Sequence, residues 1–299
     1  MSRGIVMFAH NNPEIDYGLL ALCNALMIKS NLKENKVALI TDYTTYDDLK
    51  LSKYSHLISR AFDEVVQIEP NDATKDSKMK RFNDTFSKHR VLPWHNTTRN
   101  DAYNLSPFDE TLLLDSDYLV CSPYLDTIWD TKNEIMLNHQ AKTLNHAPNR
   151  TDVMVNPFTI PLHWATMLYF KKGKAAELMF DIVSHVKENY EYYGFIYGFD
   201  GRNMYRNDFA FSIAAHMLNG YRLNNVVASF PYPTILTSYD YDDLVDMPER
   251  NSMMFLVNNQ ENRREYGVSV TKDIDVHVMN KYSILRLADK IVELHGGAQ

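Results

Sequence analysis

Two aspartates separated by one residue, Asp115 and Asp117, follow a short apolar run at residues 111–114. Such a run is typical of a buried strand, which would deliver both carboxylates to its carboxyl end. Hard divalent cations such as Mg²⁺ and Mn²⁺ prefer carboxylate oxygens and keep open positions for water or phosphate oxygens. Because residues 118–120 are also apolar, a solvated surface pair is the weaker interpretation. We therefore predict a metal site that suits a diphosphate substrate.

A histidine near the end of the chain is the third candidate ligand. His277 alternates with Val276 and Val278, so its imidazole points to the opposite face of the predicted strand from both valines. A lone histidine on a strand is more often a structural residue. Beside two carboxylates, however, an imidazole completes a donor set suited to Mn²⁺. We expect His277 to join Asp115 and Asp117.

A third acid, Asp208, lies at the start of a predicted helix that runs to residue 218. Backbone N–H groups and the helix dipole keep a carboxylate ionised and fixed in direction at this position. The alternative is a plain helix N-cap. Nearby aromatic rings suit stacking on a sugar or a base, although half or more are expected to be core residues. They are Trp164, Tyr193, Phe195, Tyr197, Phe199 and Tyr205.

The elements that would position these groups alternate between strand and helix. We predict strands at 4–9, 37–41 and 64–68, with helices at 16–30 and 46–59 between them. This spacing is typical of parallel β-α-β units, whose ligands bind at the carboxyl ends of the strands. The polar residues at those ends, besides the aspartate pair, are His10, Asn11 and Asp42.

The second half of the chain has a looser pattern. We expect a substrate-covering loop at residues 140–161 and a helix terminated by Gly220. The remaining predicted elements are strands 134–138, 164–170, 253–257 and 276–279, and helices 174–190 and 283–294. No domain boundary is evident. The sequence predicts one α/β domain over residues 1–299, with a mostly parallel central sheet flanked by helices and a C-terminal elaboration.

Charge and cysteine content restrict the classes of protein. A net charge of −7 argues against a protein that coats nucleic acid. Residues 75–99 nevertheless hold seven cations against two acids, which favours an anionic ligand there as much as a solvated helix face. Cys23 and Cys121 lie in apolar sequence, as buried thiols of a reducing compartment do. With no signal peptide or long apolar span in the sequence, we expect a cytoplasmic protein without a transmembrane segment.

In this order, the features resemble those of the GT-A glycosyltransferases, and in particular family 8. In that family an arginine on a short helix precedes the Asp-X-Asp motif and contacts the donor, a position that Arg99 matches. Residues 163–172 resemble the strand that lines the sugar pocket, although the family's common Asn-Ala-Gly is absent. His277 and Lys281 are similar to the C-terminal His…Lys motif, at shorter spacing. There the histidine completes the metal site and the lysine neutralises the leaving diphosphate.

The resemblance implies a Rossmann-like GT-A fold with a nucleotide-binding half at about 1–121 and an acceptor and sugar half at about 122–299. It also implies transfer of a sugar from a nucleoside diphosphate, UDP in the first instance, to a hydroxyl acceptor with Mn²⁺ or Mg²⁺. Asp208 would be the catalytic base or a polar group near the sugar, which leaves the stereochemistry open. The donor residues would be His10, Asn11, Asp42, Arg99, Ser116 and Lys281, and the acceptor or sugar residues Trp164, Tyr205, Arg206 and Asn207.

The acceptor and three alternatives remain open at this level. The composition of the chain, which is acidic and rich in Asn and Tyr, resembles that of sugar transferases encoded by large tailed phages. Some of these enzymes modify hydroxymethylated cytosine in DNA, and they act in the host cytoplasm. A glycan or lipopolysaccharide acceptor is one alternative, and a non-catalytic nucleotide-sugar-binding protein is another. An aspartyl-nucleophile phosphohydrolase, with Asp242 and Asp243 as further metal acids, is disfavoured because its nucleophile normally follows the first strand.

Overall fold

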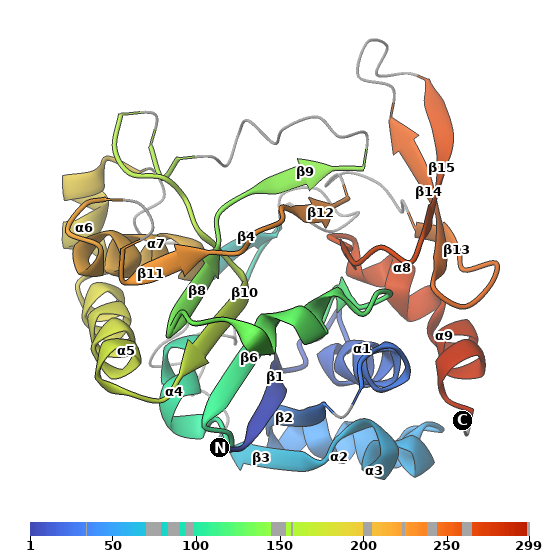
Figure 1. Cartoon of the computed structure of the whole chain (residues 1–299). Helices are drawn as coiled ribbons and strands as arrows, with labels where there is room; N and C mark the ends of the chain where they lie inside the picture. The colour runs from blue at the N-terminus through green and yellow to red at the C-terminus, as the bar shows by residue number, and fades with distance from the viewer. Residues whose placement is uncertain are drawn as a thin grey trace.

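The computed structural model describes residues 1–33, 35–69, 98–144, 154–156, 158–199, 205–222, 225–237, 244–258 and 265–297, and the backbone of 79–82 and 90–93. A seven-stranded sheet with the order β11-β8-β10-β6-β1-β2-β3 forms the centre of the molecule (Figure 1). Its strands are β1 (Arg3–Ala9), β2 (Lys36–Asp42), β3 (Glu64–Ile68), β6 (Glu110–Leu114), β8 (Ile135–Asn138), β10 (Trp164–Lys171) and β11 (Val227–Ser229).

Most neighbouring strands in this sheet are parallel, which confirms the predicted α/β class. Strand β1 is parallel to both of its neighbours, β6 and β2, and β2 is parallel to β3. Strand β11 is parallel to β8. Strand β10 is antiparallel to both of its neighbours. The polar residues that follow β1, β2 and β6 therefore meet at one edge of the sheet.

Helices cover both faces of the sheet. Because successive side chains of a strand point to opposite faces, Ile5 and Met7 join a core with α1, whereas Val6 and Phe8 join a core with α5 and α7. All four side chains are at most 3% exposed. The helices are α1 (Tyr17–Asn31), α2 (Tyr43–Leu51), α3 (Ile58–Ala61), α4 (Ala102–Leu105), α5 (Lys174–Glu188), α6 (Tyr190–Tyr197), α7 (Asn207–Leu218), α8 (Lys281–Arg286) and α9 (Ala288–His295), with 3₁₀ turns η1 (Ser55–Leu57), η2 (Arg99–Asp101) and η3 (Tyr124–Asp130).

Three smaller sheets accompany the central one. A four-stranded sheet in the order β7-β16-β12-β9 joins segments that are distant in sequence: β7 (Tyr118–Leu119), β16 (Val276–His277), β12 (Thr234–Leu236) and β9 (Ala141–Thr143). A three-stranded sheet contains β13 (Leu244–Asp246), β14 (Ser252–Asn258) and β15 (Tyr266–Lys272), and a two-stranded one contains β4 (Met79–Phe82) and β5 (Arg90–Pro93).

Several predicted boundaries are confirmed by their caps. Asp16 accepts a hydrogen bond from the backbone N–H of Leu19 at 2.8 Å and begins α1, as predicted. Asp42 accepts one from the N–H of Thr45 at 2.7 Å and begins α2 at Tyr43, three residues before the predicted start at 46. Helix α7 begins and ends within one residue of the prediction, and Gly220 follows it with φ +61°. None of the described helices combines the length and the apolar character that a membrane span requires.

Other predicted elements are wrong in extent. The helix expected at 46–59 ends at Leu51, because Ser52 adopts an extended conformation and its hydroxyl donates to the carbonyl of Leu49. The last predicted helix is two helices, α8 and α9, that meet at Leu287. The loop expected at 140–161 contains strand β9, and residues 190–197, for which no helix is predicted, form α6.

Candidate functional site

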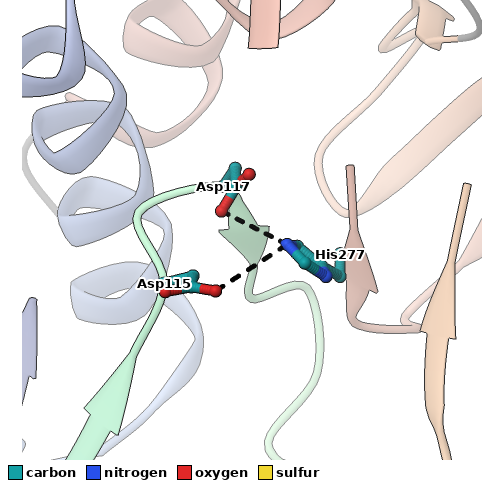
Figure 2. A group of neighbouring side chains, drawn as sticks. All are labelled: Asp115, Asp117 and His277. Atoms are coloured by element: carbon teal, nitrogen blue, oxygen red, sulfur yellow. Dashed lines mark ion pairs between the residues drawn. The ribbon is translucent and has the colours of Figure 1, made fainter. Parts of the chain in front are cut away.

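Asp115, Asp117 and His277 converge on one point (Figure 2). Both aspartates lie between β6 and β7, and the antiparallel pairing of β7 with β16 sets His277 opposite Tyr118. The Nε2 atom of His277 lies 3.3 Å from Oδ1 of Asp117 and 4.0 Å from Oδ2 of Asp115. One ligand atom from each of the three residues lies within 4.8 Å of the others. The group can therefore hold a metal ion.

The donor types and burial of these residues fit a divalent cation. Two carboxylates and an imidazole suit Mg²⁺ or Mn²⁺ in charge and in ligand atoms. Asp117 and His277 are 4% and 5% exposed, whereas the side chain of Asp115 is 29% exposed. The protein thus encloses one side of the group and leaves the other side accessible at Asp115, where a substrate oxygen can approach.

Two cations balance the two carboxylates. The ammonium of Lys281, the first residue of α8, lies 2.9 Å from Oδ2 of Asp117. The guanidinium of Arg99 donates to Oδ1 of Asp115 at 2.5 Å. Lys281 is 7% exposed and Arg99 is 2% exposed. Since each carboxylate has its own cation, the cluster is close to neutral when His277 is neutral.

The charges in the cluster shift its pKa values in different directions. Burial alone would raise the pKa of Asp117, but Lys281 and His277 hold it well below its ordinary value. Burial raises the pKa of Asp115, and the charge of Asp117 adds to this effect against the opposing charge of Arg99. Burial opposes the protonation of His277, yet the two aspartates raise its pKa. A metal ion at its Nε2 must therefore displace a proton that the carboxylates favour.

The backbone of one residue, Ala165, connects the cluster to Asp208. The carboxylate of Asp208 accepts a hydrogen bond from the N–H of Ala165 at 2.8 Å, and the carbonyl of Ala165 accepts one from Arg99. Arg99 in turn bonds Asp115. The second oxygen of Asp208 lies 3.0 Å from the guanidinium of Arg206. The start of β10 and the start of α7 thus link Asp208 to the metal-ligand group through Ala165 and Arg99.

The residues expected to hold the donor also brace the ends of β1 and β2. Nδ1 of His10 lies 3.0 Å from Oδ2 of Asp42. Burial opposes ionisation of Asp42, but hydrogen bonds from His10 and Thr45 hold its pKa below the ordinary value. The amide oxygen of Asn11 accepts from the N–H of Gly18 at 3.0 Å. Nε2 of His10 is buried and has no hydrogen-bond partner among the described residues, so it is the nitrogen that remains for a ligand.

Most of the residues expected to contact the acceptor are buried, which leaves little of their surface for stacking on a ligand. Tyr205 has no exposed surface and its ring packs edge-on against Tyr190 at 5.0 Å, and its stacking on an acceptor stays a prediction. Trp164 is 5% exposed and Asn207 is 7% exposed. The guanidinium of Arg206 lies 4.8 Å from the ring of Phe209. Of the aromatic residues noted in the sequence, Phe195 is 75% exposed.

The described residues include the remaining candidates only in part. The basic segment at residues 75–99 lies outside the residues whose side chains the structure describes, apart from Thr98 and Arg99. Ser116, between the two aspartates, is 4% exposed. Asp242 and Asp243, considered as further metal acids, also lie outside the described residues.

One supporting residue is missing from the sequence-based candidates. Oδ1 of Asp275 accepts hydrogen bonds from the N–H groups of Cys121 at 2.8 Å and Ser122 at 2.7 Å. Burial raises the pKa of Asp275 to about 6. This carboxylate ties the chain after β7 to the segment that carries His277. The signal available in the sequence was its position two residues before His277, on the same face of the predicted strand.

No family model matches the chain, and no curated protein sequence matches it. Among solved structures it is similar to the galactosyltransferase LgtC in complex with donor and acceptor sugar analogs, at 14% identity over 76% of this chain and 72% of LgtC, with a TM-score of 0.49. It is also similar to mouse xyloside xylosyltransferase 1, at 10% identity over 77% and 85% of the two chains, with a TM-score of 0.43. S. aureus TarS in complex with UDP-GlcNAc gives 14% identity over 81% and 60%, with a TM-score of 0.40. All three scores are below 0.5, so a functional assignment depends on the geometry of the site.

Proposed function

We propose that this chain is a metal-dependent glycosyltransferase that moves a sugar from a nucleoside diphosphate, UDP in the first instance, to a hydroxyl acceptor. The observation that carries the proposal is the convergence of Asp115, Asp117 and His277 at the carboxyl edge of the parallel strands, with Lys281 beside them. A bound Mn²⁺ or Mg²⁺ would supply charge stabilisation for the departing diphosphate.

The charge balance of the cluster supports a diphosphate ligand. Asp115 and Asp117 are already paired with Arg99 and Lys281. A divalent cation alone would add two positive charges to a buried and nearly neutral group, which is unfavourable without an accompanying anion. A nucleoside diphosphate supplies that anion. We therefore expect the metal and the diphosphate to bind together, each strengthening the other.

The donor would lie along the ends of β1, β2 and β6. His10, through its Nε2 atom, and Asp42 are placed to meet the nucleoside, together with Asn11 and Ser116. Lys281 would neutralise the diphosphate after the bond to the sugar breaks. The role of Arg99 is more specific than donor contact: its guanidinium is committed to Asp115 and to the Ala165 carbonyl, so it would orient a metal ligand. In this proposal residues 1–121 bind the nucleotide, and residues 122–299 contribute the sugar and acceptor side.

Asp208 is the proposed catalytic carboxylate. Its hydrogen bond from Ala165 and its contact with Arg206 hold the carboxylate in a fixed direction, and Ala165 links it to the metal-ligand group through Arg99. As a base it would take the proton of the acceptor hydroxyl, and in a retaining enzyme it would stabilise charge near the sugar. The anomeric configuration of the product, read by NMR, distinguishes these roles.

For the acceptor we propose a hydroxyl group on a polyanion, and hydroxymethylated cytosine in DNA is the first substrate to assay. The support is the excess of cations in residues 75–99 of the sequence. A glycan or lipopolysaccharide acceptor is the alternative. If DNA is the acceptor, its binding should weaken steeply with salt, and replacing Lys78, Lys80 and Arg81 by Ser should weaken it further while sparing donor hydrolysis.

The test is an assay of UDP-sugar turnover with Mn²⁺, with Mg²⁺ and with excess EDTA. We expect donor hydrolysis with either metal and none with EDTA. Asp130→Asn, at an exposed acid away from the site, is the matched control for Asp117→Asn. Metal-dependent UDP binding without any turnover would indicate a non-catalytic binder. Phosphate release from phosphomonoesters, without sugar transfer, would indicate a phosphohydrolase.

A further inference from the structure

Strand β15 (Tyr266–Lys272) has an unprotected edge. In the three-stranded sheet it pairs with β14 on one side, and no other described strand pairs with its second side. Figure 1 shows the β14–β15 ribbon extending beyond the body of the molecule. An edge strand presents a row of unpaired N–H and C=O groups to any strand that approaches. Seven residues in regular pairing with β14 make this edge long enough to add another strand.

The outer face of the ribbon is apolar where a solvent-facing sheet is normally polar. Val268 and Val270 are 65% and 57% exposed, and Tyr266 on the same face is 41% exposed. On β14, Leu256 pairs with Val268 and Met254 pairs with Val270, and both are partly exposed. The opposite face is conventional, because Met253 and Phe255 have no exposed surface and belong to the core.

The usual protections of an edge strand are missing from β15. It contains no proline and pairs with β14 in unbroken register along all seven residues, without a bulge. Its single charged residue, Lys272, lies at its end and forms an ion pair with Glu249 at 2.6 Å. The centre of the strand, Val268-Ser269-Val270, therefore carries no charge that would repel another strand.

We infer that β15 is the interface for a second copy of this chain, which pairs antiparallel with it around a two-fold axis at Ser269. The sequence of the strand is self-complementary in this register. Ser269 faces Ser269 of the second copy, and Val268 faces Val270 of the second copy, so that two Val–Val pairs flank the axis on the apolar face. β-branched pairs directly across an antiparallel ladder stabilise it. A two-fold axis also closes the assembly, because the same edge is used on both copies.

The resulting sheet contains β13, β14 and β15 of both copies and has no free β15 edge. An interface made by a single edge strand belongs to the weak class, below about 1,200 Å² of buried surface, so the dimer should dissociate on dilution. The inference concerns assembly alone and stands or falls independently of the proposed reaction.

The first experiment is analytical ultracentrifugation of the full chain over about 1 to 500 μM, the range in which weak interfaces dissociate. We expect a monomer–dimer equilibrium for the wild type. Val268→Lys should raise the dissociation constant by at least about tenfold, because two lysines would face the valines across the axis. Phe195→Lys on α6 removes an exposed apolar side chain elsewhere and should leave the equilibrium unchanged. A wild type that is monomeric throughout, or a dimer that Phe195→Lys disrupts and Val268→Lys does not, overturns the inference.

The second experiment tests the register by oxidation. Ser269→Cys lies on the axis, and opposed residues of an antiparallel pair are close enough for a disulfide. We expect this variant to form a covalent dimer under mild oxidation. Cys23 and Cys121 are buried and should not react, and Val245→Cys, exposed on β13 at the other edge of the three-stranded sheet, should remain monomeric. Failure of Ser269→Cys to cross-link, or equal cross-linking of Val245→Cys, contradicts the proposed axis.

Discussion

Two buried clusters in this molecule shift the pKa of a histidine in opposite directions. His277 lies 3.3 Å from a carboxylate oxygen of Asp117, and the aspartates raise its pKa. His163 lies between two other imidazoles, with ring centroids 5.1 Å from His139 and 5.5 Å from His216. Burial, reinforced by these two neighbours, lowers the pKa of His163 to about 3. Both side chains are almost inaccessible, at 5% and 2% exposure, so burial alone does not determine the charge of a histidine.

The difference separates a site suited to chemistry from a structural cluster. Among the described residues, the aspartate group alone brings three ligand atoms within 4.8 Å of one another. The three imidazoles instead connect the end of β8, the start of β10 and helix α7, and His139 is near the carbonyl of Leu162 at 3.2 Å. Carboxylates keep a negative charge that can bind a cation. Neutral imidazoles in an apolar region instead pack against one another and their neighbours.

The largest expected effect comes from removing a carboxylate of the metal-ligand group. Asp117→Asn should lower sugar transfer by at least about 10³-fold, because it removes a charged ligand and leaves the charge of Lys281 without its partner. Steady-state turnover at saturating Mn²⁺ measures this effect. The same substitution at exposed Asp130 should have no effect. If the turnover of Asp117→Asn stays within tenfold of the wild type, Asp117 is not required for sugar transfer, and the aspartate group no longer differs in function from the histidine cluster.

The next effect concerns Asp208, which lies outside both clusters but is linked to the first through Ala165. Asp208→Asn should lower kcat by about 10² with little change in donor affinity, since a positioned acid or base contributes about 10² to 10⁴. Single-turnover kinetics and UDP titration separate the two quantities. A variant with wild-type kcat would reduce Asp208 to a structural partner of β10.

The histidine cluster should affect stability instead of turnover. The folded-state pKa of His163 is lowered from 6.5 to about 3. As the pH falls below 6.5, the unfolded chain binds a proton at His163 while the folded chain does not. The free energy of unfolding should therefore fall as the pH falls, by about 2 kcal/mol between pH 6.5 and pH 5 from this residue.

Urea denaturation at several pH values measures this effect. His163→Gln should flatten the dependence by that amount, whereas His56→Gln, at an exposed position, should not. Equal pH dependence in wild type and His163→Gln would show that His163 is not held neutral by its surroundings.

The smallest expected effect tests how the metal-ligand group is oriented. Arg99→Lys keeps the charge, but one ammonium cannot span Asp115 and the carbonyl of Ala165 as the guanidinium does. We expect Mn²⁺ affinity in the presence of UDP to fall about tenfold, as is common when the partner of a metal ligand is changed. Arg3→Lys, at an exposed arginine, is the control. If sugar affinity falls and metal affinity does not, Arg99 contacts the donor directly.

The parts of the fold that follow from local pattern could be predicted. β1, α1, β2 and β3 were expected within about one residue, because apolar periodicity and the caps Asp16 and Asp42 define them. Helix α6 escaped prediction because its tyrosines are helix-neutral, and its end depends on Gly198 in a left-handed conformation. Strands β9 and β12 of the four-stranded sheet are held by pairing between distant segments, which no local pattern reveals.

The candidate site shows the same division. Asp115, Asp117 and His277 were selected for their residue types, and their convergence depends on the pairing of β7 with β16. The burial of Tyr205 was missed because aromatic residues serve in cores and at ligand sites alike. The connection from Asp208 through Ala165 to Arg99 was also missed, because it passes through the backbone N–H and C=O of Ala165 and leaves no trace in side-chain types.

The central claim is that the buried aspartate–histidine group binds a divalent cation together with a nucleoside diphosphate. Isothermal titration of the full chain with UDP, in Mn²⁺ and in excess EDTA, tests it most directly, with Asp117→Asn as the comparison. We predict that UDP binds at least about a hundredfold more tightly with Mn²⁺, a coupling of about 2.7 kcal/mol, and that Asp117→Asn removes this difference. Equal UDP affinity with and without Mn²⁺ in the wild type, or no UDP binding in either condition, would contradict the account.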